Sequence, residues 1–84
     1  MTPDEKQRMI DFILKRIRKP NLAIDENTPL VSSGLVDSMT LGDLLLELED
    51  VTHLRIPPGR VRPKDLDTVA LMFATAARVG KPQK

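Results

Sequence analysis

Proline and glycine divide this 84-residue chain into short segments, three of which repeat apolar residues at helical spacing. The first, residues 4–19, ends before Pro20, because the residue preceding a proline is pushed out of helical geometry. Residues 38–52 and 67–78 show the same periodicity, with Asp37 or Ser38 as the expected cap of the first helix and Asp67 as the expected cap of the second. No segment alternates apolar and polar residues as a half-buried strand would, so the chain is predicted to be all-α.

The remaining segments complete the predicted architecture. Residues 20–37 contain turn-forming residues and also apolar residues that need a place in a core, so a long ordered loop is expected. Residues 60–66 have room for one or two helical turns, and residues 80–84 follow Gly80 as a frayed tail. The whole chain is therefore predicted to form one domain, a four-helix bundle with a long first loop and a short third helix.

Composition excludes several classes of protein. The core must be aliphatic, because the chain has two Phe and no Tyr or Trp. Without cysteine there are no disulfides, and the single His53 cannot form a zinc site by itself. The longest apolar run, residues 69–74, is too short to cross a bilayer, and the N-terminal residues lack the apolar stretch of a signal peptide. A cytoplasmic monomer without a membrane span is expected.

Residues 38–52 carry apolar side chains on two sides when drawn as a helix of about 100° per residue. One side is the expected core stripe, made of Leu41, Leu44, Leu45, Leu48 and Val51. The opposite side places Met39 and Leu46 among three acids: Asp43, Glu47 and Asp50. An apolar centre with an acidic rim is typical of a docking surface for a basic partner, although single exposed apolar residues are also common.

Ser38 lies at the predicted start of this helix, in the sequence Gly-Leu-Val-Asp-Ser-Met-Thr. Serines at such positions are most often helix caps, and either Asp37 or Ser38 could cap this helix. A serine nucleophile would need a neighbouring base, but His53 is the only histidine and would lie ~22 Å away along a straight helix. Hydrolase chemistry is therefore not expected, whereas the positive end of the helix dipole favours a phosphate attached to Ser38.

Five blocks of sequence, in order, resemble the acyl or peptidyl carrier protein family, the small four-helix domains of fatty-acid, polyketide and nonribosomal peptide synthesis. The blocks are DENTPL at 25–30, GLVDSM at 34–39, LLLELED at 44–50, IPP at 56–58 and KDLDTVALM at 64–72. The second block resembles the family's Asp-Ser-(Leu or Met) attachment motif. Its spacing, with Gly34 four residues before Ser38, looks more like discrete carriers of the D-alanyl type than like housekeeping fatty-acid carriers.

The resemblance implies that Ser38, next to Asp37, carries 4′-phosphopantetheine. A separate, magnesium-dependent phosphopantetheinyl transferase would supply this group from coenzyme A. Acyl or aminoacyl groups would then be carried as thioesters on the terminal thiol, from loading enzymes to processing enzymes of fatty-acid, polyketide or other specialised biosynthesis. The chain itself would not be an enzyme, and the prosthetic group would provide the sulfur that a protein without cysteine lacks.

The charge of the chain departs from that of housekeeping carriers, which are strongly acidic. The net charge is +1, and Arg60, Arg62 and Lys64 follow Pro58 where many relatives have acids. Because partner choice is set by repulsion as well as attraction, a dedicated partner with acidic groups facing Arg60 and Arg62 is predicted.

Two other functions compete with this interpretation. A nucleic-acid-binding helical domain could use the basic residues in 6–19 and 55–64. It would need a contiguous basic face and stacking aromatics, and the acidic segment 38–52 would repel phosphate, so no nucleic-acid partner is expected. The second alternative is an unmodified helical protein–protein adaptor.

Overall fold

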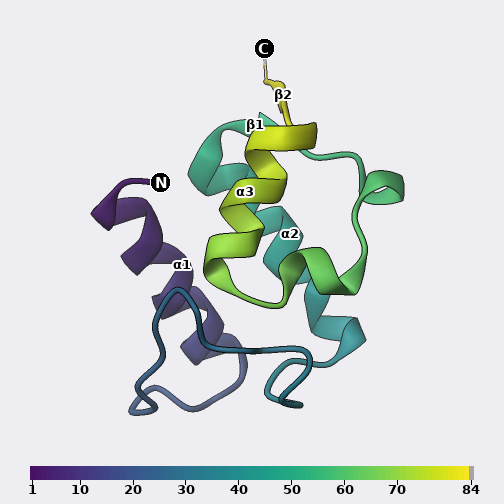
Figure 1. Ribbon diagram of the computed structural model, residues 1–84. Coiled ribbons are helices and arrows are strands. Elements are labelled where there is room, and N and C mark those ends of the chain that lie inside the picture. Colours follow the sequence, from purple (N-terminus) through teal and green to yellow (C-terminus); the bar gives the residue numbers. More distant parts are fainter. Residues whose placement is uncertain (84) are drawn as a thin grey trace.

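The computed structural model describes residues 1–83 and is mostly helical (Figure 1), which confirms the helical fold class in this coarse form. The α-helices are α1 (Pro3–Arg16), α2 (Ser38–Thr52) and α3 (Val69–Val79). Between α2 and α3 lie two 3-10 turns, η1 (Pro58–Arg60) and η2 (Pro63–Leu66). Two short strands, β1 (Leu54–Arg55) and β2 (Lys81–Pro82), form an antiparallel pair.

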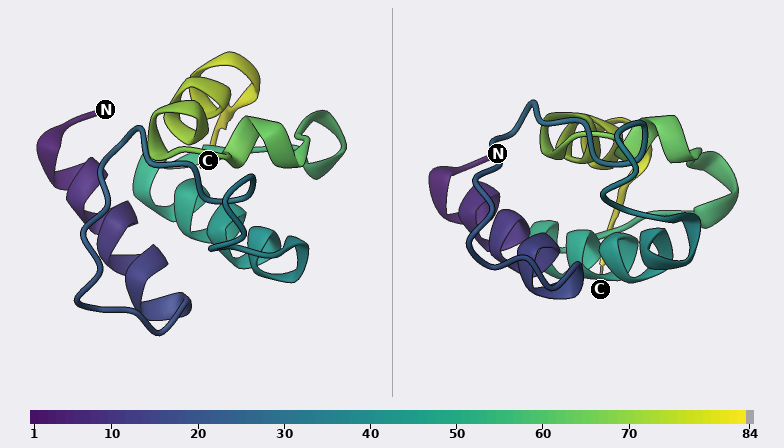
Figure 2. Two further views of the ribbon diagram at one scale, coloured as in Figure 1. Left: turned by 60° about the horizontal axis from the view of Figure 1, so that its bottom comes forward. Right: turned by 90° about the horizontal axis from the view of Figure 1, so that it is seen from below.

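Helix α2 is central, because its contacts with α1 and with α3 are both more extensive than the contact between α1 and α3. Figure 2 shows α1 and α2 side by side, with α3 and η2 lying across one face of this pair. The core between these elements is aliphatic, as the composition predicts. Its fully buried large side chains are Met9, Ile13, Leu30, Leu44, Leu48, Ile56, Val69 and Met72.

The first helix is shorter than the predicted 4–19, because the chain leaves α1 in a Schellman motif rather than at the proline. Arg18 adopts the left-handed conformation, with φ 61°, and its N–H donates to the Lys15 carbonyl at 3.2 Å. The N–H of Lys19 donates to the Leu14 carbonyl at 2.9 Å. This pair of bonds ends helices, but glycine is the usual left-handed residue, so an arginine there gives no sequence signal.

The predicted short helix over 60–66 is only partly present, as 3-10 turns rather than an α-helix: the segment holds the last residue of η1 and all of η2. Arg62 is extended, with φ −110° and ψ 159°, as expected for the residue before a proline. Pro63 has no N–H with which to continue a helical ladder from the preceding turn. The chain therefore makes two separate turns, each beginning at a proline.

Helix α3 begins two residues later than the predicted 67–78, because Thr68 and not Asp67 is its N-cap. The Thr68 hydroxyl accepts the Leu71 N–H at 3.0 Å. The Asp67 carboxylate turns instead to the long loop between α1 and α2. It accepts three consecutive backbone N–H groups at 3.2, 2.7 and 2.9 Å, those of Leu30, Val31 and Ser32.

The predicted frayed tail 80–84 is wrong over the residues that the structure describes. Lys81 pairs with Arg55 across the two strands, and the Gln83 side-chain amide donates to the Leu54 carbonyl at 3.2 Å. Position 84 lies outside the described residues. Two-residue strands are too short to show an alternating pattern, so periodicity could not predict this pair.

Replacing Gly80 by Ala is expected to lower the free energy of unfolding by about 2 kcal/mol, since the new methyl group overpacks a closed space. A Cβ at this position would clash with the Ala76 carbonyl oxygen and would lie 3.0 Å from the Leu54 Cβ. Chemical denaturation measures the change. The matched control is Gly59→Ala, whose Cβ would have no neighbour within 4 Å in the part of the chain described. Equal stability of the two variants would contradict this packing of Gly80.

Candidate functional site

The first turn of α2 is capped by Asp37, which leaves Ser38 as the first helical residue. The Asp37 carboxylate accepts the Thr40 hydroxyl at 2.8 Å and the Thr40 N–H at 2.9 Å. These two hydrogen bonds, first that of the hydroxyl, lower the pKa of Asp37 below its ordinary value of 3.8. The sequence left the cap open between Asp37 and Ser38, and the structure assigns it to Asp37.

Ser38 is exposed, and within residues 1–83 its hydroxyl makes no hydrogen bond. It borders a hollow of about 230 Å³ between α2 and the segment 58–66. Most of the lining is apolar, including Leu41, Leu45 and Leu66, and Arg62 is the charged residue beside it. The hydroxyl is therefore accessible to a reagent from solution and lies next to an apolar surface.

The structure does not bring His53 to Ser38. His53 is the C-cap of α2, at the opposite end of a 15-residue helix. At 1.5 Å per residue the two ends are about 22 Å apart, so His53 cannot take a proton from the Ser38 hydroxyl. The single histidine therefore lies out of reach of Ser38.

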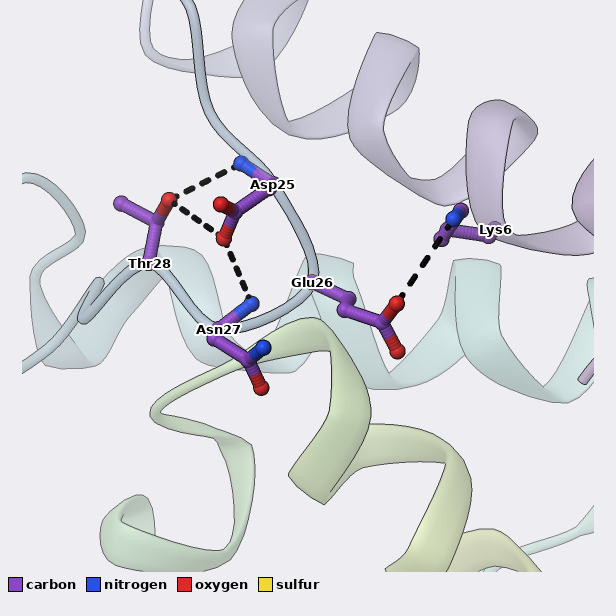
Figure 3. Close-up of polar contacts among 5 residues, drawn as sticks. All are labelled: Lys6, Asp25, Glu26, Asn27 and Thr28. Carbon is purple, nitrogen blue, oxygen red and sulfur yellow. Dashed lines mark hydrogen bonds and ion pairs between the residues drawn. The ribbon is translucent and has the colours of Figure 1, made fainter.

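The long loop that precedes Ser38 is ordered by a compact turn over residues 25–28 (Figure 3). The Asp25 carboxylate accepts the Asn27 N–H at 2.8 Å, and the Thr28 hydroxyl accepts the Asp25 N–H at 2.9 Å. Next to this turn, Lys6 of α1 pairs with Glu26 at 3.6 Å. The Glu26 carbonyl also accepts an N–H from the first turn of α3. The loop is thus fixed to both helices before it reaches α2.

The two apolar residues predicted on the outer side of α2 lie at the surface. Met39 is 87% exposed and Leu46 is 65% exposed. Leu44 and Leu48, on the other side, are fully buried. The helical periodicity therefore separated the two sides of α2 correctly.

The acids of the predicted docking rim lie toward α1, and arginines of that helix neutralise them. Arg16 pairs with Asp43 at 2.7 Å. Arg8 pairs with Glu47 at 3.3 Å and also with Asp50. A basic partner would have to compete with these ion pairs, so a docking role for the three acids stays a prediction.

The predicted basic docking residues differ in position. Arg60 lies in η1 and Arg62 precedes η2, and both are exposed. Neither forms an ion pair within the part of the chain that the structure describes. Only Arg62 borders the hollow beside Ser38.

Sequence reasoning missed three charged residues near this site. Asp67 was expected to be a helix cap. Asp67 and Thr68 are both good cap residues, but a helix needs only one, so the other is available to bind elsewhere. Arg55 and Lys81 border a second hollow along α2; Arg55 was noted only as part of the basic segment 55–64, and no local pattern pointed to Lys81. Their proximity depends on the pairing of β1 with β2.

Among residues 1–83 the structure contains no helix that is both long and apolar enough to cross a bilayer. In the same part of the chain, His, Asp and Glu side chains do not gather into a group that could hold a metal ion. Comparisons with protein families, with curated proteins and with solved structures give no match.

Proposed function

We propose that this chain is a carrier protein whose Ser38 hydroxyl receives 4′-phosphopantetheine from a phosphopantetheinyl transferase. The observation that carries the proposal is the free, exposed hydroxyl at the first position of α2, with Asp37 acting as the cap in its place. The resemblance of residues 34–39 to the carrier attachment motif supports the same assignment.

The residues around Ser38 fit this group. The unpaired N–H groups and the dipole at the start of a helix favour a phosphodiester on Ser38. The apolar lining of the adjoining hollow suits the uncharged part of the arm. When bound, the group would supply a thiol on which acyl or aminoacyl cargo is held as a thioester for partner enzymes. The chain's own part would be to hold and present the arm, without catalysis.

The proposed fold is that of a carrier in which η2 takes the place of the short third helix. Like that helix, η2 lies between α2 and α3 in the chain and contacts both. The ordered loop 20–37 would be the long first connection of the four-helix arrangement. Its bonds to Asp67 and to the first turn of α3 hold the chain that leads to Ser38.

Incubation with coenzyme A, magnesium and a broad-specificity phosphopantetheinyl transferase is expected to add one phosphopantetheine group to the wild-type chain. Ser38→Ala is expected to remain unmodified, because only that hydroxyl has the required position. Intact mass spectrometry measures the adduct. The control is Ser33→Ala, which removes another serine hydroxyl of the same region, one that donates to the Pro29 carbonyl at 2.6 Å, and should leave the adduct in place. An unmodified wild-type chain, in a reaction that converts a known carrier, would refute the proposal.

The exposure of Met39 and Leu46 favours one second candidate, an adaptor that binds proteins without modification. The same mass measurement separates the two functions. An adaptor would keep its unmodified mass, whereas a carrier would gain the adduct at Ser38.

A further inference from the structure

A second hollow, of about 520 Å³, lies along α2 beyond the one beside Ser38. The two hollows share three lining residues, Gly42, Leu45 and Pro58. One continuous groove therefore runs along α2 from Ser38 toward the paired strands β1 and β2. We call it the α2 groove.

Gly42 stands where the two hollows join. A glycine inside a helix is about 1 kcal/mol less favourable than alanine. Packing does not require glycine here, since a Cβ at Gly42 would meet nothing within 4 Å among the described residues. The effect of the missing side chain is that the α2 groove stays open at its middle.

The far half of the α2 groove combines an apolar floor with cationic edges. Leu46 and the prolines at 57 and 58 supply apolar surface. Arg55 and Lys81 are partners in the strand pair, both are exposed, and neither has an ion-pair partner within residues 1–83. This half of the groove can therefore offer positive charge to a ligand beside an apolar contact.

Acids offset this charge only in part. One acid, Glu49, lines the far half, where its carboxylate accepts the Ile56 N–H at 2.8 Å, so the two cations exceed it by one unit of charge. The other acids of α2 lie toward α1, where Arg8 and Arg16 neutralise them. The exposed apolar side of α2 thus has unpaired cations on one flank and internally neutralised acids on the other.

We propose that the α2 groove is a docking surface for a protein segment that presents an apolar side chain flanked by carboxylates. Charge complementarity with Arg55 and Lys81 would orient that segment, and Leu46 would meet its apolar side chain. The inference extends the proposed function and rests on it for one point only, that the partner is an enzyme acting at Ser38. Binding of a peptide to the α2 groove does not require the modification of Ser38.

The first test uses the unmodified full-length chain and a synthetic peptide with leucines flanked by glutamates. Titration followed by NMR is expected to shift the amide signals of Gly42, Leu46, Arg55 and Lys81. Reversing two charges, in Arg55→Glu/Lys81→Glu, is expected to raise the Kd about tenfold or more. The control Lys15→Glu/Lys19→Glu makes the same change of net charge on and just after α1, and should change the Kd by less than about threefold.

A second variant tests the shape of the groove. Gly42→Leu should fill the junction and raise the Kd about tenfold, while Gly42→Ala should have a smaller effect and raise the melting temperature. Tighter binding of a matched peptide with lysines in place of glutamates would overturn the proposal. So would shifts from the acidic peptide that are confined to residues outside the groove. Because the peptide needs no adduct, loss of binding and loss of modification are separate results.

Discussion

Replacing Leu44 by Ala is expected to lower the free energy of unfolding by about 3 kcal/mol, because it removes a fully buried side chain and leaves a cavity. Leu44 lies on the side of α2 that packs into the core, and α2 contacts both other helices. In a domain of this size the melting temperature should fall by roughly 15 °C. Thermal unfolding followed by circular dichroism measures the change.

The matched control is Leu46→Ala, which makes the same chemical change two residues further along the same helix. Leu46 is 65% exposed, so its truncation should change the free energy of unfolding by less than about 0.5 kcal/mol. The pair separates burial from helix propensity, since both variants gain the same preference of alanine for helix. Similar losses in the two variants would contradict the orientation of α2 described above.

Replacing Asp67 by Asn should lower the free energy of unfolding by about 2 kcal/mol, since hydrogen bonds to a charged acceptor are stronger than those to a neutral one. The Asp67 carboxylate accepts the N–H groups of residues 30–32, and also the Ser32 hydroxyl at 2.9 Å. An amide of the same shape keeps the packing but weakens all of these bonds. The expected fall in melting temperature is roughly 10 °C.

The control for this variant is Asp11→Asn, which neutralises an exposed acid whose bond is to Gln7 of its own helix. Its stability should remain close to that of the wild type. If Asp67→Asn were as stable as this control, the loop would not depend on the Asp67 carboxylate.

Asp67 also makes the stability of the fold depend on pH at low pH. Hydrogen bonds from the loop, first that of the Ser32 N–H, lower the pKa of Asp67 below its ordinary value of 3.8. The unfolded chain therefore binds the proton more readily, and the contribution of Asp67 to stability is complete only above that value. As the pH falls from 3.8 through the lowered pKa, this contribution is lost. Asp67→Asn should show a shallower loss of stability over the same range.

The bonds of Asp67 connect the stability of the fold with the candidate site. They hold residues 30–32, from which a short stretch of chain leads to the Asp37 cap and Ser38. Weakening them is expected to loosen the approach to Ser38 as well as to destabilise the domain. The position of the Ser38 hydroxyl thus depends on a residue at the junction of η2 and α3.

The features that the sequence predicted correctly depend on local periodicity. Helix α2 spans the predicted 38–52, its core stripe is buried or half-buried, and Met39 and Leu46 are exposed. A helix repeats every 3.6 residues, so an uninterrupted run of 15 residues defines both its limits and its two sides.

What only the tertiary structure decided depends on residues far apart in the chain. The acids of α2 face arginines of α1, Asp67 binds the loop at 30–32, and Arg55 lies beside Lys81. Helical periodicity fixes the side of a helix on which a charge lies, but not the helix or strand that packs against it. A side chain that accepts distant N–H groups, or that loses its free charge to another helix, does so because the packed core brings these segments together.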